Sequence, residues 1–69
     1  MTPTDFRAAR IRLGLSQAQL AQALRVQSDR TIRKWEQGER DIPGPAQVLM
    51  EIMDALPAAR RWMERESSI

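Results

Sequence analysis

Residues 17–37, QAQLAQALRVQSDRTIRKWEQ, decide the fold of this chain. They contain two short segments, residues 17–24 and 29–37, in which apolar residues recur at helical spacing and which a brief turn joins. The large apolar residues would form the seam between the two helices: Leu20, Leu24, Val26, Ile32 and Trp35. The small residue Ala21 lies where the second helix must approach closely. The stretch therefore predicts a helix-turn-helix.

Residues at the ends of these two segments support the same prediction. Ser16, followed three residues later by Gln19, predicts a capping box at the start of the first helix. Ser28 is the predicted N-cap of the second helix, and Asp29 would lie at the positive end of its dipole. Gly38 is expected to end that helix in a left-handed conformation.

The remainder of the chain is expected to be helical as well. Alternating strand patterns and hairpin signals are missing, and the Gly and Pro residues fall where helices would be separated. The predicted helices cover about residues 4–13, 17–24, 29–37, 45–55 and 58–66. The apolar stripe of the 45–55 helix is predicted to be Val48, Leu49, Ile52 and Met53. We therefore expect residues 1–69 to form one compact all-α domain of five helices.

Composition excludes several classes of function. The chain has 69 residues and contains neither Cys nor His, which removes thiol nucleophiles, imidazole bases and most ligands of zinc and haem. A domain of this size encloses no deep pocket, and the sequence offers no acid–base or nucleophile pair. We expect no enzymatic activity, no cofactor, no metal site and no small-molecule ligand.

The longest apolar run, Val48-Leu49-Met50, is far too short for a membrane span or a signal peptide. With no cysteine and no targeting segment, the sequence predicts a cytoplasmic protein without a membrane partner.

The distribution of charge points to a polyanionic partner. Residues 1–40 carry eight basic and four acidic side chains, whereas residues 41–69 carry three basic and five acidic ones. Ten of the eleven cations are Arg, whose planar guanidinium suits two-point contacts with phosphates and guanine edges. One end of the molecule is therefore expected to face a polyanion.

The 29–37 helix carries a polar stripe that fits the major groove of DNA. Its members follow at i, i+3, i+4 and i+7: Arg30, Arg33, Lys34 and Gln37. Arg30 and Lys34 are the candidates for reading guanine, and Asp29 either accepts from a cytosine amine or stabilises the helix start. The candidates for phosphate contacts are Gln17, Ser28, Thr31, Arg33 and Arg40.

LGLSQAQLAQAL (residues 13–24), followed by SDRTIRKWEQGER (residues 28–40), resembles the lambda-repressor-like, Cro-type (XRE) helix-turn-helix regulators. The resemblance covers roughly residues 6–56. It implies a five-helix domain that binds double-stranded DNA, usually as a homodimer on an inverted repeat, and regulates transcription, here as an autorepressor. It further implies an internal ion pair between Arg10 and Glu36 that ties the first helix to the third.

Two features of the turn depart from this family. Arg25 stands where the family usually has Gly, and Gln27 is an additional residue. We expect the longer turn to remove the need for glycine by letting the 17–24 helix run on a little. The angle at which the third helix enters the groove depends on this turn.

The C-terminal helix leaves two roles open. Trp62, with its apolar neighbours, either closes the small core or forms a dimer seam, and the candidate dimer residues are Leu56, Trp62, Met63 and Ile69. A rival interpretation is a protein-interaction module of the same fold, an antitoxin or co-regulator whose partner protein binds the last two helices. RNA binding is disfavoured because exposed aromatic residues for base stacking are missing from the motif.

Overall fold

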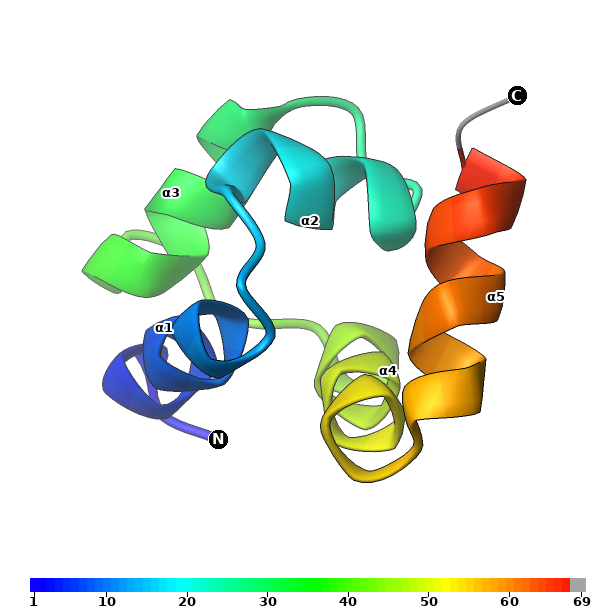
Figure 1. Ribbon diagram of the computed structural model, residues 1–69. Helices are drawn as coiled ribbons and strands as arrows, with labels where there is room; N and C mark the ends of the chain where they lie inside the picture. Colours follow the sequence, from blue (N-terminus) through cyan, green and yellow to red (C-terminus); the bar gives the residue numbers. More distant parts are fainter. Residues whose placement is uncertain (68–69) are drawn as a thin grey trace.

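The computed structural model describes residues 1–67, which form five helices and no strands (Figure 1). The helices are α1 (Pro3–Arg12), α2 (Gln17–Ala23), α3 (Asp29–Gln37), α4 (Gly44–Ala55) and α5 (Pro57–Ser67). The expected all-α architecture is confirmed, and each helix end lies within one residue of the predicted one. No helix in residues 1–67 has both the length and the apolar character needed to cross a membrane.

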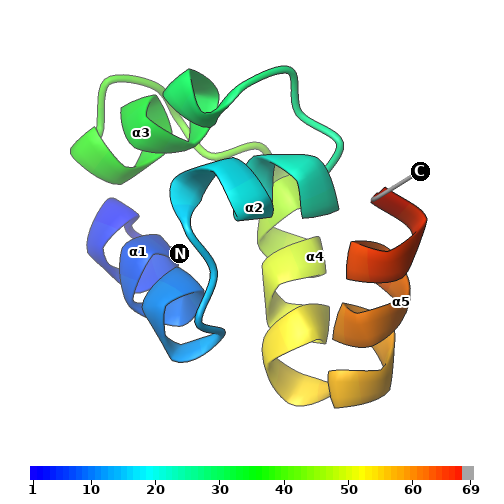
Figure 2. The same ribbon diagram turned by 45° about the horizontal axis from the view of Figure 1, so that its top comes forward.

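The five helices surround one small core. α2 packs on α3, α1 lies against both α3 and α4, and α5 contacts α4 and the C-terminal part of α2 (Figures 1 and 2). The largest fully buried side chains come from four of these helices: Phe6, Leu20, Ile32, Met50 and Met53. Trp35 is buried too and meets the ring of Phe6 edge-on, with the ring centres 5.8 Å apart. α3 is thereby fastened to α1 through its inner side.

Local capping explains where the first two helices begin. α1 starts at Pro3 because Thr2 and Asp5 form a capping box around it, a signal that the predicted start at residue 4 passed over. The predicted box between Ser16 and Gln19 is confirmed at the start of α2. Ser28 does precede α3 in extended backbone, but its side chain makes no cap hydrogen bond, so that part of the prediction is wrong.

The turn after α2 differs from the expectation. α2 ends at Ala23 and does not run on, and Arg25 itself adopts the left-handed conformation, with a φ of +59°. Its N–H donates to the carbonyl of Gln22, and the N–H of Val26 donates to the carbonyl of Ala21. These two bonds form a Schellman motif, in which the left-handed position normally belongs to Gly. The longer turn therefore did not remove the need for a left-handed residue.

The apolar stripe predicted for α4 is only partly confirmed: Met53 is buried and Leu49 packs against the core, but the buried face is rotated away from Val48 and Ile52. Met50 is 0% exposed and is joined in the core by Ala46 and Met53, whereas Val48 is 52% exposed and Ile52 also faces solvent. At 100° per residue, Val48 and Ile52 lie roughly opposite Met50 on the helix. Both faces of α4 are apolar, and the thin core accommodates only one of them.

Candidate nucleic-acid interface

α3 presents a cationic edge to solvent because its opposite side is anchored in the core. Ile32 and Trp35 are buried, while Arg30 and Arg33 are exposed and Lys34 is half-buried. These three residues, Arg30, Arg33 and Lys34, are called the cationic edge below. The side chain of Arg30 has no hydrogen bond or ion pair within the part of the chain that the structure describes. It is therefore available to a ligand.

Asp29 and Arg33 face each other one turn apart on α3. The distance between Arg33 Nη2 and Asp29 Oδ2 is 3.8 Å, and both side chains are about half exposed. Such a pair is weak in water and gives way readily to a competing charge. A phosphate can therefore draw Arg33 away from Asp29.

Next to Arg33 of the cationic edge lies a polar network that joins three elements. Arg10 donates to Glu36 from Nε at 2.6 Å and from Nη2 at 3.2 Å, and its Nη1 donates to the carbonyl of Leu15 at 2.9 Å. Gln17 Nε2 adds a third hydrogen bond to the Glu36 carboxylate at 3.2 Å. The ion pair that the resemblance implied is thus present, and it links α1, the start of α2 and α3.

This network changes how Gln17 must be regarded. Gln17 Nε2 donates one of its hydrogens to the Glu36 carboxylate, so this half-buried side chain has a structural role in the ion-pair network. The phosphate contact expected for Gln17 remains a prediction for its other polar groups.

A shallow depression of about 280 Å³ brings α1 into the same surface. It is lined by Arg7, Arg10, Gln17, Arg33, Glu36 and Gln37. Arg7, which was not among the site residues predicted from the sequence, lines this depression together with Arg33 and is a further candidate cation. The spacing of Arg7 in the sequence could have indicated this role. Arg7 lies about one turn before Arg10, so the two side chains share the side of α1 that faces Glu36.

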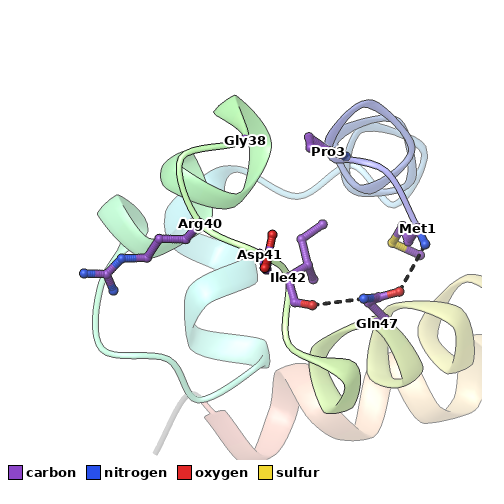
Figure 3. A pocket seen from close by; sticks show the side chains of 7 residues that line it. All are labelled: Met1, Pro3, Gly38, Arg40, Asp41, Ile42 and Gln47. Atoms are coloured by element: carbon purple, nitrogen blue, oxygen red, sulfur yellow. Dashed lines mark hydrogen bonds between the residues drawn. The ribbon is translucent and has the colours of Figure 1, made fainter.

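The remaining phosphate candidates lie near the two ends of α3. Ser28 is exposed before the helix, and Thr31 is half-buried in its first turn. Arg40 follows α3 and extends away from the pocket that Figure 3 shows between the N-terminus and the connector to α4. Gln47 holds that connector, because its Nε2 donates to the carbonyl of Ile42 at 2.9 Å (Figure 3).

The candidate dimer residues do not form one surface. Leu56 and Trp62 are 56% and 53% exposed, whereas Met63 is buried in the core of its own chain. Ile69 lies outside the described residues.

Comparison with known families assigns the chain to a class. The model of the helix-turn-helix family HTH_3 matches residues 6–57, which cover most of the chain from within α1 to the end of α4. The protein belongs to this family of XRE-type, lambda-repressor-like DNA-binding regulators. The resemblance inferred from the sequence is thereby confirmed over nearly the same residues. Searches of curated proteins and of solved structures found no match.

Proposed function

We propose that this helix-turn-helix regulator is a sequence-specific autorepressor that binds an inverted-repeat operator in double-stranded DNA as a homodimer, with α3 in the major groove. The observation that carries the proposal is the exposure of the cationic edge while Ile32 and Trp35 are buried on the other side of the same helix. A helix held in this way can enter a groove without unfolding any of the core.

Arg30 and Lys34 are the proposed base-reading residues. They lie four residues apart on α3, so their side chains project from adjacent turns on one side of the helix. Arg and Lys donate to the O6 and N7 atoms of guanine, and a good two-point contact discriminates by about 1–3 kcal/mol. Asp29 is the proposed acceptor for a cytosine amine next to them, once Arg33 has turned to a phosphate.

Phosphate contacts are proposed on both sides of this edge. Arg7, Arg33 and Gln17 border the depression between α1 and α3, while Arg40 lies beyond the other end of α3. Ser28 and Thr31 complete the set near the start of the helix. Contacts of this kind set the register of the protein on DNA but carry no sequence information.

A homodimer fits the exposed apolar side chains of the C-terminal half. Leu56 and Trp62 leave apolar surface in water, and covering it would stabilise a small domain with a thin core. Two copies related by a two-fold axis would place their α3 helices in successive major grooves, about 34–36 Å apart.

A second candidate function rests on the same two exposed residues. If they bind a different protein, the chain is an interaction module, an antitoxin or co-regulator with the same fold. Sedimentation of the native chain and of Trp62→Ala separates the two: a native dimer that Trp62→Ala converts to a monomer supports self-association through this residue, and a native monomer supports a partner protein.

Selection of bound duplexes from a random DNA pool tests the proposed function. We expect an enriched inverted repeat with half-sites about one helical turn apart. Enrichment of one unrepeated half-site would contradict the dimer, and no enrichment at all would contradict sequence-specific binding.

A further inference from the structure

Three helix ends in this fold share one backbone conformation, and one of them lacks glycine. The residues after α1, α2 and α3 with positive φ are Gly14 at +72°, Arg25 at +59° and Gly38 at +78°. A side chain at such a φ is strained because its Cβ approaches a neighbouring carbonyl. Arg25 is the sole non-glycine residue in this conformation within residues 1–67. Its side chain must therefore supply an interaction that offsets the strain.

The guanidinium of Arg25 joins the ends of two helices. Its Nη1 donates to the carbonyl of Ala23 at 2.6 Å and to the carbonyl of Met63 at 3.1 Å. Ala23 is the last residue of α2, and Met63 lies about one turn before α5 ends at Ser67. The carbonyl of Ala23, at the end of α2, lacks a helical partner, and Met63 lies towards the C-terminal, negative end of the α5 dipole, so a cation between them is stabilised by both helices.

Trp62 adds a third contact to the same side chain. The guanidinium carbon of Arg25 lies 6.0 Å from the centre of the Trp62 ring, at the limit of a cation–π contact. One residue of the turn is therefore held by the backbone and by a ring of α5. Figure 1 shows the C-terminal end of α2 beside α5, as these contacts require.

The position of Arg25 limits where α3 can begin. Only three residues, Val26 to Ser28, separate it from Asp29 at the start of α3, and Arg30 follows at once. We infer that Arg25 is a positioning residue that fastens the turn of the helix-turn-helix to α5, so that α5 helps to set the N-terminal end of α3. The consequence for DNA rests on the proposed function, whereas the attachment to α5 does not.

The variant Arg25→Gly distinguishes this role from a purely local one. Glycine adopts the left-handed conformation without strain, so a residue needed only for the turn would leave α5 as it is. If Arg25 fastens α5, its loss exposes the amides of α5 to more frequent opening. We expect hydrogen exchange in residues 60–66 of the free protein to accelerate by about tenfold or more relative to the core amides of α1. Rates in α5 within about twofold of the native protein would overturn the inference.

Two further variants serve as controls for charge and for chemistry. Arg61→Ala removes the same charge from an exposed arginine of α5 that has no hydrogen bond or ion pair in the described part of the chain. It should leave exchange in α5 within about twofold of native. Arg25→Lys keeps the cation on a side chain that ends one bond short of the Nη1 position from which Arg25 reaches both carbonyls, so an intermediate rate is expected. A rate in Arg61→Ala equal to that of Arg25→Gly would overturn the assignment, because loss of charge alone would then explain the effect.

The link from α5 to DNA is tested with the duplex selected from the random pool. Arg25→Gly should bind it about tenfold more weakly, with the affinity for random duplex falling no further than in Arg61→Ala. Native affinity combined with a loosened α5 would overturn the link to α3. If the native chain selects no duplex, the proposed function fails, and the exchange experiment still decides the attachment of Arg25.

Discussion

The guanidinium of Arg10 on α1 and the carboxylate of Glu36 on α3 form a two-point ion pair whose side chains are only 13% and 5% exposed. Because the pair is nearly buried, each charge depends on the other for the hydrogen bonds that water would otherwise supply. It holds α3 against α1. The orientation of α3, the helix proposed to enter the groove, therefore depends on this contact with α1.

Replacing Glu36 by Gln should strongly destabilise the protein. The change keeps the shape but leaves the Arg10 charge without its counter-charge, which costs about 3 kcal/mol at a buried site. Urea unfolding followed by circular dichroism measures the loss. Glu39→Gln is the matched control, since this exposed carboxylate should contribute within about 0.5 kcal/mol. Equal midpoints for the two variants would show that the pair does not hold α3.

Alanine substitutions on the two faces of α4 test which face is buried. Met50→Ala empties a site in the core and should lower the free energy of unfolding by about 2–5 kcal/mol. Val48→Ala removes an exposed side chain and should change it by less than about 0.5 kcal/mol. The reverse order in a pair of urea titrations would mean that α4 packs with the face that its sequence pattern first indicated.

Acid should weaken the contact between α1 and α4. Arg12 Nη2 donates to Asp54 Oδ2 at 2.8 Å, and this hydrogen bond holds the pKa of Asp54 below its ordinary value of 3.8. Because the pKa of Asp54 is lower in the folded than in the unfolded protein, its charged carboxylate stabilises the fold fully at pH values above the ordinary pKa. This contribution is lost as the pH falls through the lower pKa of the folded protein. Both side chains are substantially exposed, so the effect is small.

The test compares the free energy of unfolding of the native protein with that of Asp54→Asn, from about pH 6 down to about pH 2.5. The native protein should be slightly more stable at about pH 6, and the difference should disappear well below the ordinary carboxylate pKa. A difference that stays constant down to about pH 2.5 would contradict a role for the charged carboxylate.

The helix-turn-helix was predictable because its signals are local. Ser16 with Gln19, the apolar positions Ile32 and Trp35, and Gly38 act within a turn or two of their own residues. Gly38 needed no knowledge of the remainder of the fold, because the left-handed end of a helix selects for glycine whatever packs nearby.

The errors concern choices that depend on distant partners. Val48 and Met50 lie on two apolar faces of one helix, and only the packing of α1 and α5 decides between them. Arg25 tolerates a left-handed backbone because its side chain meets the ring of Trp62 and the carbonyl of Met63 in α5, the latter 38 residues away in the chain. Arg7 belongs to the candidate interface only because α1 packs beside α3.

Arg7→Ala tests whether the depression between α1 and α3 binds a phosphate. The variant should bind the selected duplex and random duplex with equally reduced affinity, because a phosphate contact carries no sequence information. The slope of log affinity against log salt concentration should fall by about 1, as one counterion fewer is released. An unchanged slope, matching that of the native chain, would remove Arg7 from the interface.

The most direct test of the account is the ratio of affinities of Arg30→Ala for the selected duplex and for random duplex, measured beside Arg61→Ala. If the cationic edge of α3 reads bases, Arg30→Ala loses about 1–3 kcal/mol of discrimination while most of the salt-dependent background remains, and Arg61→Ala keeps the native ratio. A native ratio in Arg30→Ala would contradict base reading by this edge.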